Sequence, residues 1–264
     1  MRIFRGEMTH LVFAALGGLV LLFIIAPLAG MFLSVTPGDL SESVIDPEVS
    51  RSVRVTLFTS MGATLIMALG SVPLAWLLAR KDFPLKQLIN GIIDLPIVIP
   101  HSAAGIALLG VIARGTPMAR LAEKAGFEFV GGYAGIMAAM AFVSVPFLVN
   151  SARDGFAAVP RQLEKAALNL GASPVRVFFT ISVPIAWRSI LSGLILMWAR
   201  GMSEFGAVLV VAYHPMITPV LIYERFGAFG LKYARPVSVL FVTICLLFFI
   251  TFRVIAGRRR DAQG

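Results

Sequence analysis

The sequence predicts an all-α integral membrane protein with six transmembrane helices, and three observations support this fold class. The chain is 58% hydrophobic and only 14% charged, with a mean hydropathy of +0.88, which excludes a disordered chain and argues against a soluble domain. Six apolar stretches are each long enough to cross about 30 Å of hydrocarbon, which takes about 20 helical residues. These stretches lack the alternation of a membrane β-barrel, so a helical bundle is expected.

The predicted spans follow one another along the whole chain. They cover residues 11–33, 53–79, 91–113, 133–150, 187–212 and 236–255. The first is longer than the apolar core of a signal peptide, about 7–15 residues, and lacks a clean A-x-A cleavage site, so we expect a retained anchor. Pro73 in the second span, and Pro96 and Pro100 in the third, are expected to kink those helices.

Lys and Arg are distributed unevenly between the two sides of this bundle. Fourteen of the 23 lie on the side that holds both termini, eight lie on the other side, and Arg200 lies inside a span. Cytoplasmic segments carry the excess of basic residues, so both termini are predicted to be cytoplasmic, in a multi-pass protein of the cell membrane. The net charge of +9 therefore indicates membrane topology and no nucleic-acid partner, because the basic residues stand at the ends of apolar runs.

The chain divides into three predicted parts. Residues 1–50 hold the first span and an acidic extracytoplasmic loop, residues 51–256 form the transmembrane core, and residues 257–264 form a basic cytoplasmic tail that contains Arg258, Arg259 and Arg260. The outer loop at 114–132 is predicted to contain a short interfacial helix. Another outer loop, at 213–235, is rich in aromatic residues, as expected of an interface belt next to lipid headgroups.

A polar stretch between the fourth and fifth spans, at about residues 160–171, has the signals of an ordered helix outside the lipid. Pro160 suits the first helical position, Gly171 suits a left-handed C-terminal cap, and Ser173-Pro174 suits the start of a second helix. One apolar stripe consists of Leu163, Ala166, Ala167 and Leu170. Such a helix either docks into a groove of a soluble partner or lies on the lipid surface, and these residues leave both readings open.

Two ionisable residues, Arg200 and Glu204, lie inside the predicted fifth span. They are four positions apart, so they can pair across one helical turn. An unpaired arginine at mid-span costs about 2.5–3.5 kcal/mol, which a pair would offset. Either the pair holds this helix in the bundle, or Arg200 faces a water-filled translocation path and favours anions.

Motifs of enzymes and metal sites are missing from the sequence. It contains no phosphate-binding loop of the G-x-x-x-x-G-K-[ST] type and no H-E-x-x-H, G-x-S-x-G or C-x-x-C motif. The three histidines, His10, His101 and His214, are scattered, and the single Cys245 lies in an apolar run, where we expect it to pack. We therefore predict no catalytic residue, no metal site and no cofactor.

The polar stretch carries a resemblance to a known family. Ala166-Ala167-x-x-x-Gly171, followed after nine residues by Ile181-x-Val183-Pro184, resembles the E-A-A motif of ABC importer permeases. The spacing matches throughout, although Lys165 takes the motif's Glu position, with Glu164 just before it, and Val183 replaces Leu. In that family this segment is the coupling helix that docks on the ATPase subunit. The resemblance thus implies a docking role for Arg161, Leu163, Glu164, Lys165, Ala166, Ala167, Leu170, Gly171, Ser173 and Pro174.

The resemblance extends over nearly the whole chain. Residues 74–84, 95–100 and 203–207 resemble the molybdate, sulfate and tungstate branch of type I permeases, and residues 212–226 are closer still to the archaeal-type molybdate/tungstate permeases. This implies a homodimer, two ATP-binding cassette ATPase subunits and an extracytoplasmic oxyanion-binding protein as partners. Two alternatives stay open: an ABC permease for sulfate, another anion or ferric iron, and a self-sufficient channel or ion-coupled carrier.

Overall fold

The computed structural model describes residues 2–257, with the side chains of residues 9–251, and every regular element in this range is helical. Five helical runs are long and apolar enough to cross a membrane: α1 (Arg2–Leu33), α3 (Pro47–Arg80), α7 (Tyr133–Ala157), α13 (Leu231–Gly257), and the continuous run α9 (Pro174–Val177), η1 (Phe178–Ser182) and α10 (Val183–Met202). A sixth crossing is possible through α4 (Lys86–Val98) and α5 (His101–Ile112) taken together. The predicted helical membrane fold is confirmed.

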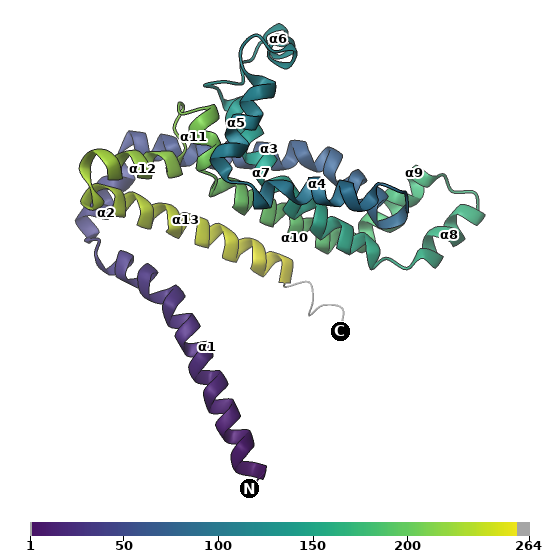
Figure 1. Ribbon diagram of the computed structural model, residues 1–264, viewed down its shortest axis with the longest axis horizontal. Coiled ribbons are helices and arrows are strands. Elements are labelled where there is room, and N and C mark those ends of the chain that lie inside the picture. The colour runs from purple at the N-terminus through teal and green to yellow at the C-terminus, as the bar shows by residue number, and fades with distance from the viewer. Residues whose placement is uncertain (1, 258–264) are drawn as a thin grey trace.

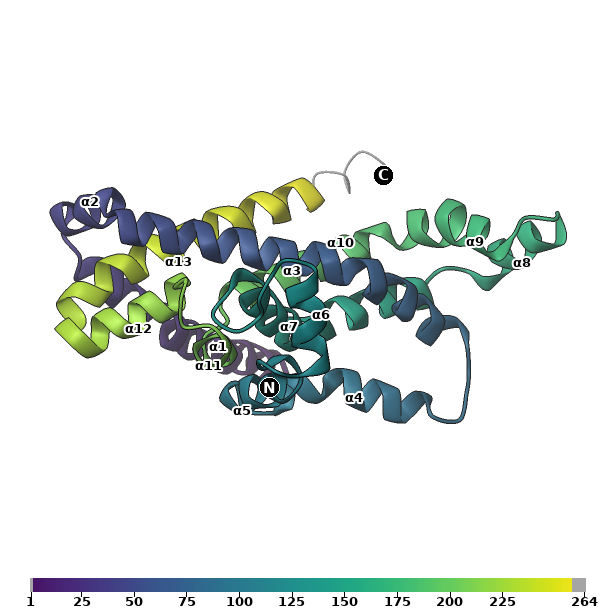
Figure 2. The ribbon, with the colours of Figure 1, turned by 90° about the horizontal axis from the view of Figure 1, so that it is seen from above.

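Helix α7 lies at the centre of the bundle, with α3 and α10 packed along it (Figure 2). Three apolar clusters hold the helices together. One joins α3, α5, α7 and α11 (Gly206–Val211) around Met140, the second joins α3, α4, α7 and α10 around Phe156, and the third joins α3, α10, α12 (Thr218–Phe229) and α13 around Trp198. Small hydroxyl side chains assist close packing, since Ser151 of α7 donates to the carbonyl oxygen of Ser189 in α10 at 2.7 Å.

The third predicted span is broken rather than kinked. Helix α4 continues through Pro96 and ends at Val98, and α5 starts at His101 after a bend of 117°. The break falls at Ile99, which has an extended backbone with ψ of 147°. Proline disfavours the helical conformation of the residue before it, so Pro100 accounts for the end of α4.

The fifth predicted span, at 187–212, is wrong at both ends. The helical run begins at Pro174 and ends at Met202, and α11 is a separate short helix that starts at Gly206. One oxygen of the Glu204 carboxylate accepts the backbone N–H of Ala207 at 2.9 Å, so this side chain satisfies the first turn of α11. Hydropathy cannot detect such a break, because the residues on both sides of it are apolar.

The two ends of the bundle carry different short helices. Helices α8 (Arg161–Asn169) and α9 project at one end, whereas α2 (Pro37–Ile45) and α12 lie at the other (Figure 1). Helix α6 (Pro117–Lys124), which extends beyond α5, is the short helix expected at 114–132. Helix α1 diverges from the bundle, and its apolar side chains are bare, Phe23 being 80% exposed. Of the predicted basic tail at 257–264, residues 258–264 lie outside the described residues.

Candidate functional site

Local signals determine where α8 begins and ends. Pro160 is the residue before the first helical turn, one position earlier than predicted, and Gly171 takes the left-handed conformation with φ of 87°. The N–H of Gly171 donates to the carbonyl of Leu168, and the N–H of Ala172 donates to that of Ala167, both at 3.0 Å. This is the Schellman arrangement, in which a glycine closes the helix without a Cβ penalty. The predicted cap by Ser173 is also present, since its hydroxyl accepts the N–H of Arg176 at 3.3 Å.

The outward face of α8 is partly apolar and bare. Leu163 is 48% exposed and Leu170 is 88% exposed, and between them Ala166 is exposed and Ala167 half-buried. The residues of the predicted apolar stripe thus lie on one face of the helix, and no other part of the described chain covers most of that face. Five of the other predicted docking residues are exposed as well: Arg161, Lys165, Gly171, Ser173 and Pro174.

Glu164 differs from its neighbours on α8 because its side chain points inward and is buried. Its Oε2 atom lies 2.7 Å from Nε of Arg80, the last residue of α3, and its Oε1 atom accepts from Nη2 of the same arginine at 3.1 Å. The hydroxyl of Ser182, in η1, donates to Oε1 at 2.6 Å. Arg80 also donates to the carbonyl oxygen of Val159, just past the end of α7, at 3.0 Å. Sequence reasoning missed Arg80 and Ser182, which no spacing rule links to Glu164.

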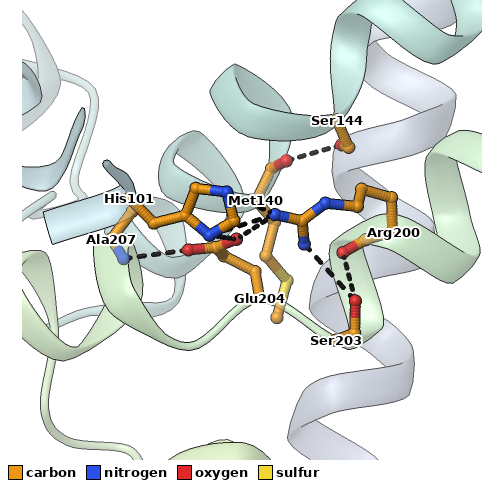
Figure 3. Close-up of polar contacts among 7 residues, drawn as sticks. All are labelled: His101, Met140, Ser144, Arg200, Ser203, Glu204 and Ala207. Carbon is orange, nitrogen blue, oxygen red and sulfur yellow. Dashed lines mark hydrogen bonds and ion pairs between the residues drawn. The ribbon is translucent and has the colours of Figure 1, made fainter. Parts of the chain in front are cut away.

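The second group of site residues is a buried charge cluster of His101, Arg200 and Glu204 (Figure 3). As predicted, Arg200 and Glu204 pair across one turn, with Nη2 and Oε2 3.0 Å apart. His101, at the start of α5, places Nδ1 3.2 Å from the same Oε2 atom, and its Nε2 lies 2.8 Å from Nη2 of Arg200. Glu204 is fully buried, whereas Arg200 and His101 keep partial contact with solvent.

This cluster joins the two breaks in the bundle. His101 follows the bend between α4 and α5, and Glu204 lies between α10 and α11. Gly206 allows the two breaks to meet, because a Cβ atom on it would lie 2.9 Å from the Cβ of His101. The sequence predicted the Arg200–Glu204 contact from its spacing, but it gave no reason to select His101, which lies 99 positions from Arg200.

At the opposite end of the bundle, Arg225 of α12 holds the acidic segment that follows α2. Its Nη2 atom lies 2.6 Å from Asp46 and 3.0 Å from Glu48. Burial raises the pKa of Asp46, but hydrogen bonds from Arg225 and from the N–H of Glu48 outweigh it, so this pKa lies below its ordinary value. The pKa of Arg225 is correspondingly raised, because hydrogen bonds to the two carboxylates outweigh its own desolvation.

Comparison with known proteins gives consistent results. The family model described as binding-protein-dependent transport system inner membrane component matches residues 71–261. The molybdate/tungstate transport system permease protein WtpB of Thermococcus kodakarensis is 43% identical over 257 residues, which are 97% of this chain and 99% of that protein. The protein of the same name from Pyrococcus furiosus is 44% identical over 260 residues, 98% of this chain and 99% of that protein.

A solved structure shares the fold. A chain of a bacterial ABC transporter involved in the import of the acidic polysaccharide alginate has a TM-score of 0.73 at 14% sequence identity. The match covers 98% of this chain and 99% of that one, so the helices correspond from end to end. The predicted ABC importer fold is confirmed by this match.

Proposed function

The chain belongs to the family of inner membrane components of binding-protein-dependent transport systems, and we propose that it is the permease subunit of an ATP-driven importer of molybdate and tungstate. The observation that carries the cargo class is the 43–44% identity, over at least 97% of this chain, with relatives named for these two oxyanions. A protein of this family is a membrane component of a transporter and is not itself an enzyme. ATP hydrolysis is therefore assigned to partner subunits.

We assign the docking of those ATPase subunits to α8. The assignment is supported by the bare leucines Leu163 and Leu170, and by the place of α8 at one end of the bundle (Figure 1). An amphipathic helix that presents small and apolar side chains suits a groove on a soluble partner. The family motif, which spans α8 and the start of α10, favours this role over a helix lying on the lipid surface.

The assembly that we propose contains two copies of the chain. Each copy offers one α8, so a pair related by a two-fold axis offers one docking helix to each of two ATPase subunits. An oxyanion-binding protein would dock at the opposite end. There a cavity of about 490 Å³ is lined by charged side chains of both signs, among them Asp39, Glu224, Arg225 and Lys232. A surface of this kind favours a polar partner with complementary charges.

Transport then follows from coupled motion. When ATP draws the two ATPase subunits together, both α8 helices move, and the spans attached to them alternate between inward-open and outward-open states. The path itself must bind its oxyanion weakly enough to release it. One carboxylate oxygen of Glu204 accepts the N–H of Ala207, and the other lies within ion-pair distance of Arg200 and His101. We therefore assign the charge cluster to holding the broken spans together rather than to binding cargo.

The test of this function is uptake into vesicles that contain the chain together with its ATPase subunits and its binding protein. We expect ATP-dependent uptake of radiolabelled molybdate and tungstate, each competing with the other, and little competition by sulfate or ferric iron. Preferential uptake of sulfate or iron would contradict the proposed cargo while leaving the permease role intact.

A further inference from the structure

We propose that Glu164 is a positioning residue, which fixes α8 to two transmembrane runs of its own chain and, through Arg80, to the end of α7, and that it makes no contact with the ATPase. This inference rests on the proposed function, because it concerns how motion of α8 reaches the transmembrane helices. It changes the docking role implied for Glu164 by the family motif. The residues left to face the partner are the exposed ones, above all Leu163, Lys165 and Leu170.

The geometry leaves Glu164 no free oxygen for a partner. Its side chain is 10% exposed and that of Arg80 is 7% exposed. The two carboxylate oxygens accept three contacts, at 2.7 Å and 3.1 Å from Arg80 and at 2.6 Å from Ser182. A buried ion pair is tolerated only when its remaining hydrogen-bonding capacity is satisfied, and a two-point contact between arginine and carboxylate fixes the orientation of both groups.

Glu164 contacts two transmembrane runs directly, and the contacts of Arg80 extend to the end of α7. Arg80 is the last residue of α3, and Ser182 lies in the helical run that continues into α10. Arg80 also donates to the carbonyl oxygen of Val159, which lies just beyond the end of α7. Helix α8 has only nine residues, and short segments of chain link it to α7 and α9. Without the buried carboxylate, these segments would allow α8 to tilt under load. With it, a displacement of α8 must also displace α3, α7 and α10.

Two adjacent residues on α8 therefore have separable roles. Glu164 faces the bundle and transmits motion, whereas its neighbour Lys165 is exposed and faces the partner side. Replacement of Lys165 by Gln should weaken binding of the ATPase subunits. Replacement of Glu164 by Gln, which keeps the size of the side chain but removes its charge, should leave binding intact and uncouple hydrolysis from transport.

The experiment compares the Glu164→Gln, Lys165→Gln and Glu128→Gln variants in the assembled transporter. Glu128 is the matched control, because it also pairs with an arginine, Arg114, but on an exposed surface away from α8. We expect Glu164→Gln to co-purify with the ATPase, to show faster hydrogen exchange in α8, and to lose roughly fivefold or more in uptake per ATP hydrolysed. Lys165→Gln should lose co-purification, and Glu128→Gln should match the wild type.

Three results for the Glu164→Gln variant would overturn the inference. The first is unchanged hydrogen exchange in α8, and the second is an unchanged amount of uptake per ATP hydrolysed. The third is loss of ATPase binding while α8 stays protected from hydrogen exchange. If Glu164→Gln does not fold, Ser182→Ala removes a single hydrogen bond and should show the same effects to a smaller degree. Hydrogen exchange requires no cargo. If wild-type vesicles take up neither oxyanion, the proposed cargo is contradicted. The hydrogen-exchange result would still test the positioning role of Glu164.

Discussion

At the scale of single residues, two buried glutamates fix the polar geometry of the molecule. Glu164 is held by Arg80 and Ser182 where α8 meets the spans, and Glu204 is held by Arg200, His101 and a backbone N–H where two spans break. Each carboxylate accepts hydrogen bonds on one oxygen and lies at ion-pair distance from an arginine with the other, which offsets the cost of removing a charge from water. Loss of either charge should therefore leave its arginine with an uncompensated charge.

We expect Glu204→Gln to destabilise the protein by about 3 kcal/mol, the low end of the range for removing one member of a buried pair. The low end applies because Arg200 keeps 21% of its side chain exposed to solvent. Thermal unfolding in detergent measures the effect. The double variant Arg200→Met with Glu204→Gln, which leaves no unpaired charge, should recover most of the loss.

The same double variant separates a structural role from a transport role. If the cluster only holds the bundle together, the well-folded double variant should transport near the wild-type rate. A folded double variant without uptake would instead place Arg200 on the translocation path.

The ion pairs of Arg225 predict a stability that depends on pH. Because the pKa of Asp46 is lower in the folded chain than its ordinary value of 3.8, its ionised form stabilises the fold. This contribution is complete above the unfolded pKa and is lost as the pH falls below 3.8 through the lowered folded pKa. We expect Asp46→Asn to lower the Tm by about 2–4 °C near pH 6, which corresponds to about 1 kcal/mol, and the difference from the wild type to shrink near pH 3. A difference that grows in acid would contradict the assignment.

At the scale of elements, α8 has two sides with different properties. Its inward side is anchored by an ion pair, and its outward side is apolar and bare. Its end is closed by Gly171 in a conformation that branched side chains disfavour. An intact cap is thus a requirement for presenting Leu170, which directly precedes it.

We expect Gly171→Val to cost about 1–2 kcal/mol at this position and to distort the end of α8, so that the ATPase subunits no longer co-purify. Gly171→Asn is the matched control, because asparagine tolerates the left-handed conformation and should retain binding. Normal co-purification and uptake by Gly171→Val would count against α8 as the docking element.

Features set by neighbouring residues could be predicted from the sequence, and features set by packing could not. The glycine cap at the end of α8, the Ser173 cap of α9 and the Arg200–Glu204 pair each depend on nearby residues, and all three are confirmed, whereas Pro160 lies one position earlier than predicted. The contact between Arg80 and Glu164 spans 84 positions, so it exists only because α3 ends beside α8. The fifth span was misplaced for a related reason, since the cap that Glu204 supplies to α11 interrupts an apolar run.

At the scale of the whole molecule, the transmembrane helices connect two ends that we assign to different partners. Helix α8 stands at one end of the bundle and α12 at the other, with α3, α7 and α10 running between them (Figures 1 and 2). The chain belongs to a family of transporter membrane components, so we assign the ATP-driven step to the partner ATPase subunits. Helix α1 and the outward face of α8 are among the apolar surfaces that the described chain leaves exposed.

The most direct test of this account measures oxyanion flux into vesicles that contain the chain alone and into vesicles that also contain its ATPase and binding protein. We expect no flux above background from the chain alone, with or without ATP enclosed in the vesicles. We expect ATP-dependent accumulation of molybdate and tungstate once both partners are present. Rapid flux through the isolated chain would contradict the account, because it would describe a channel or carrier that needs no ATPase.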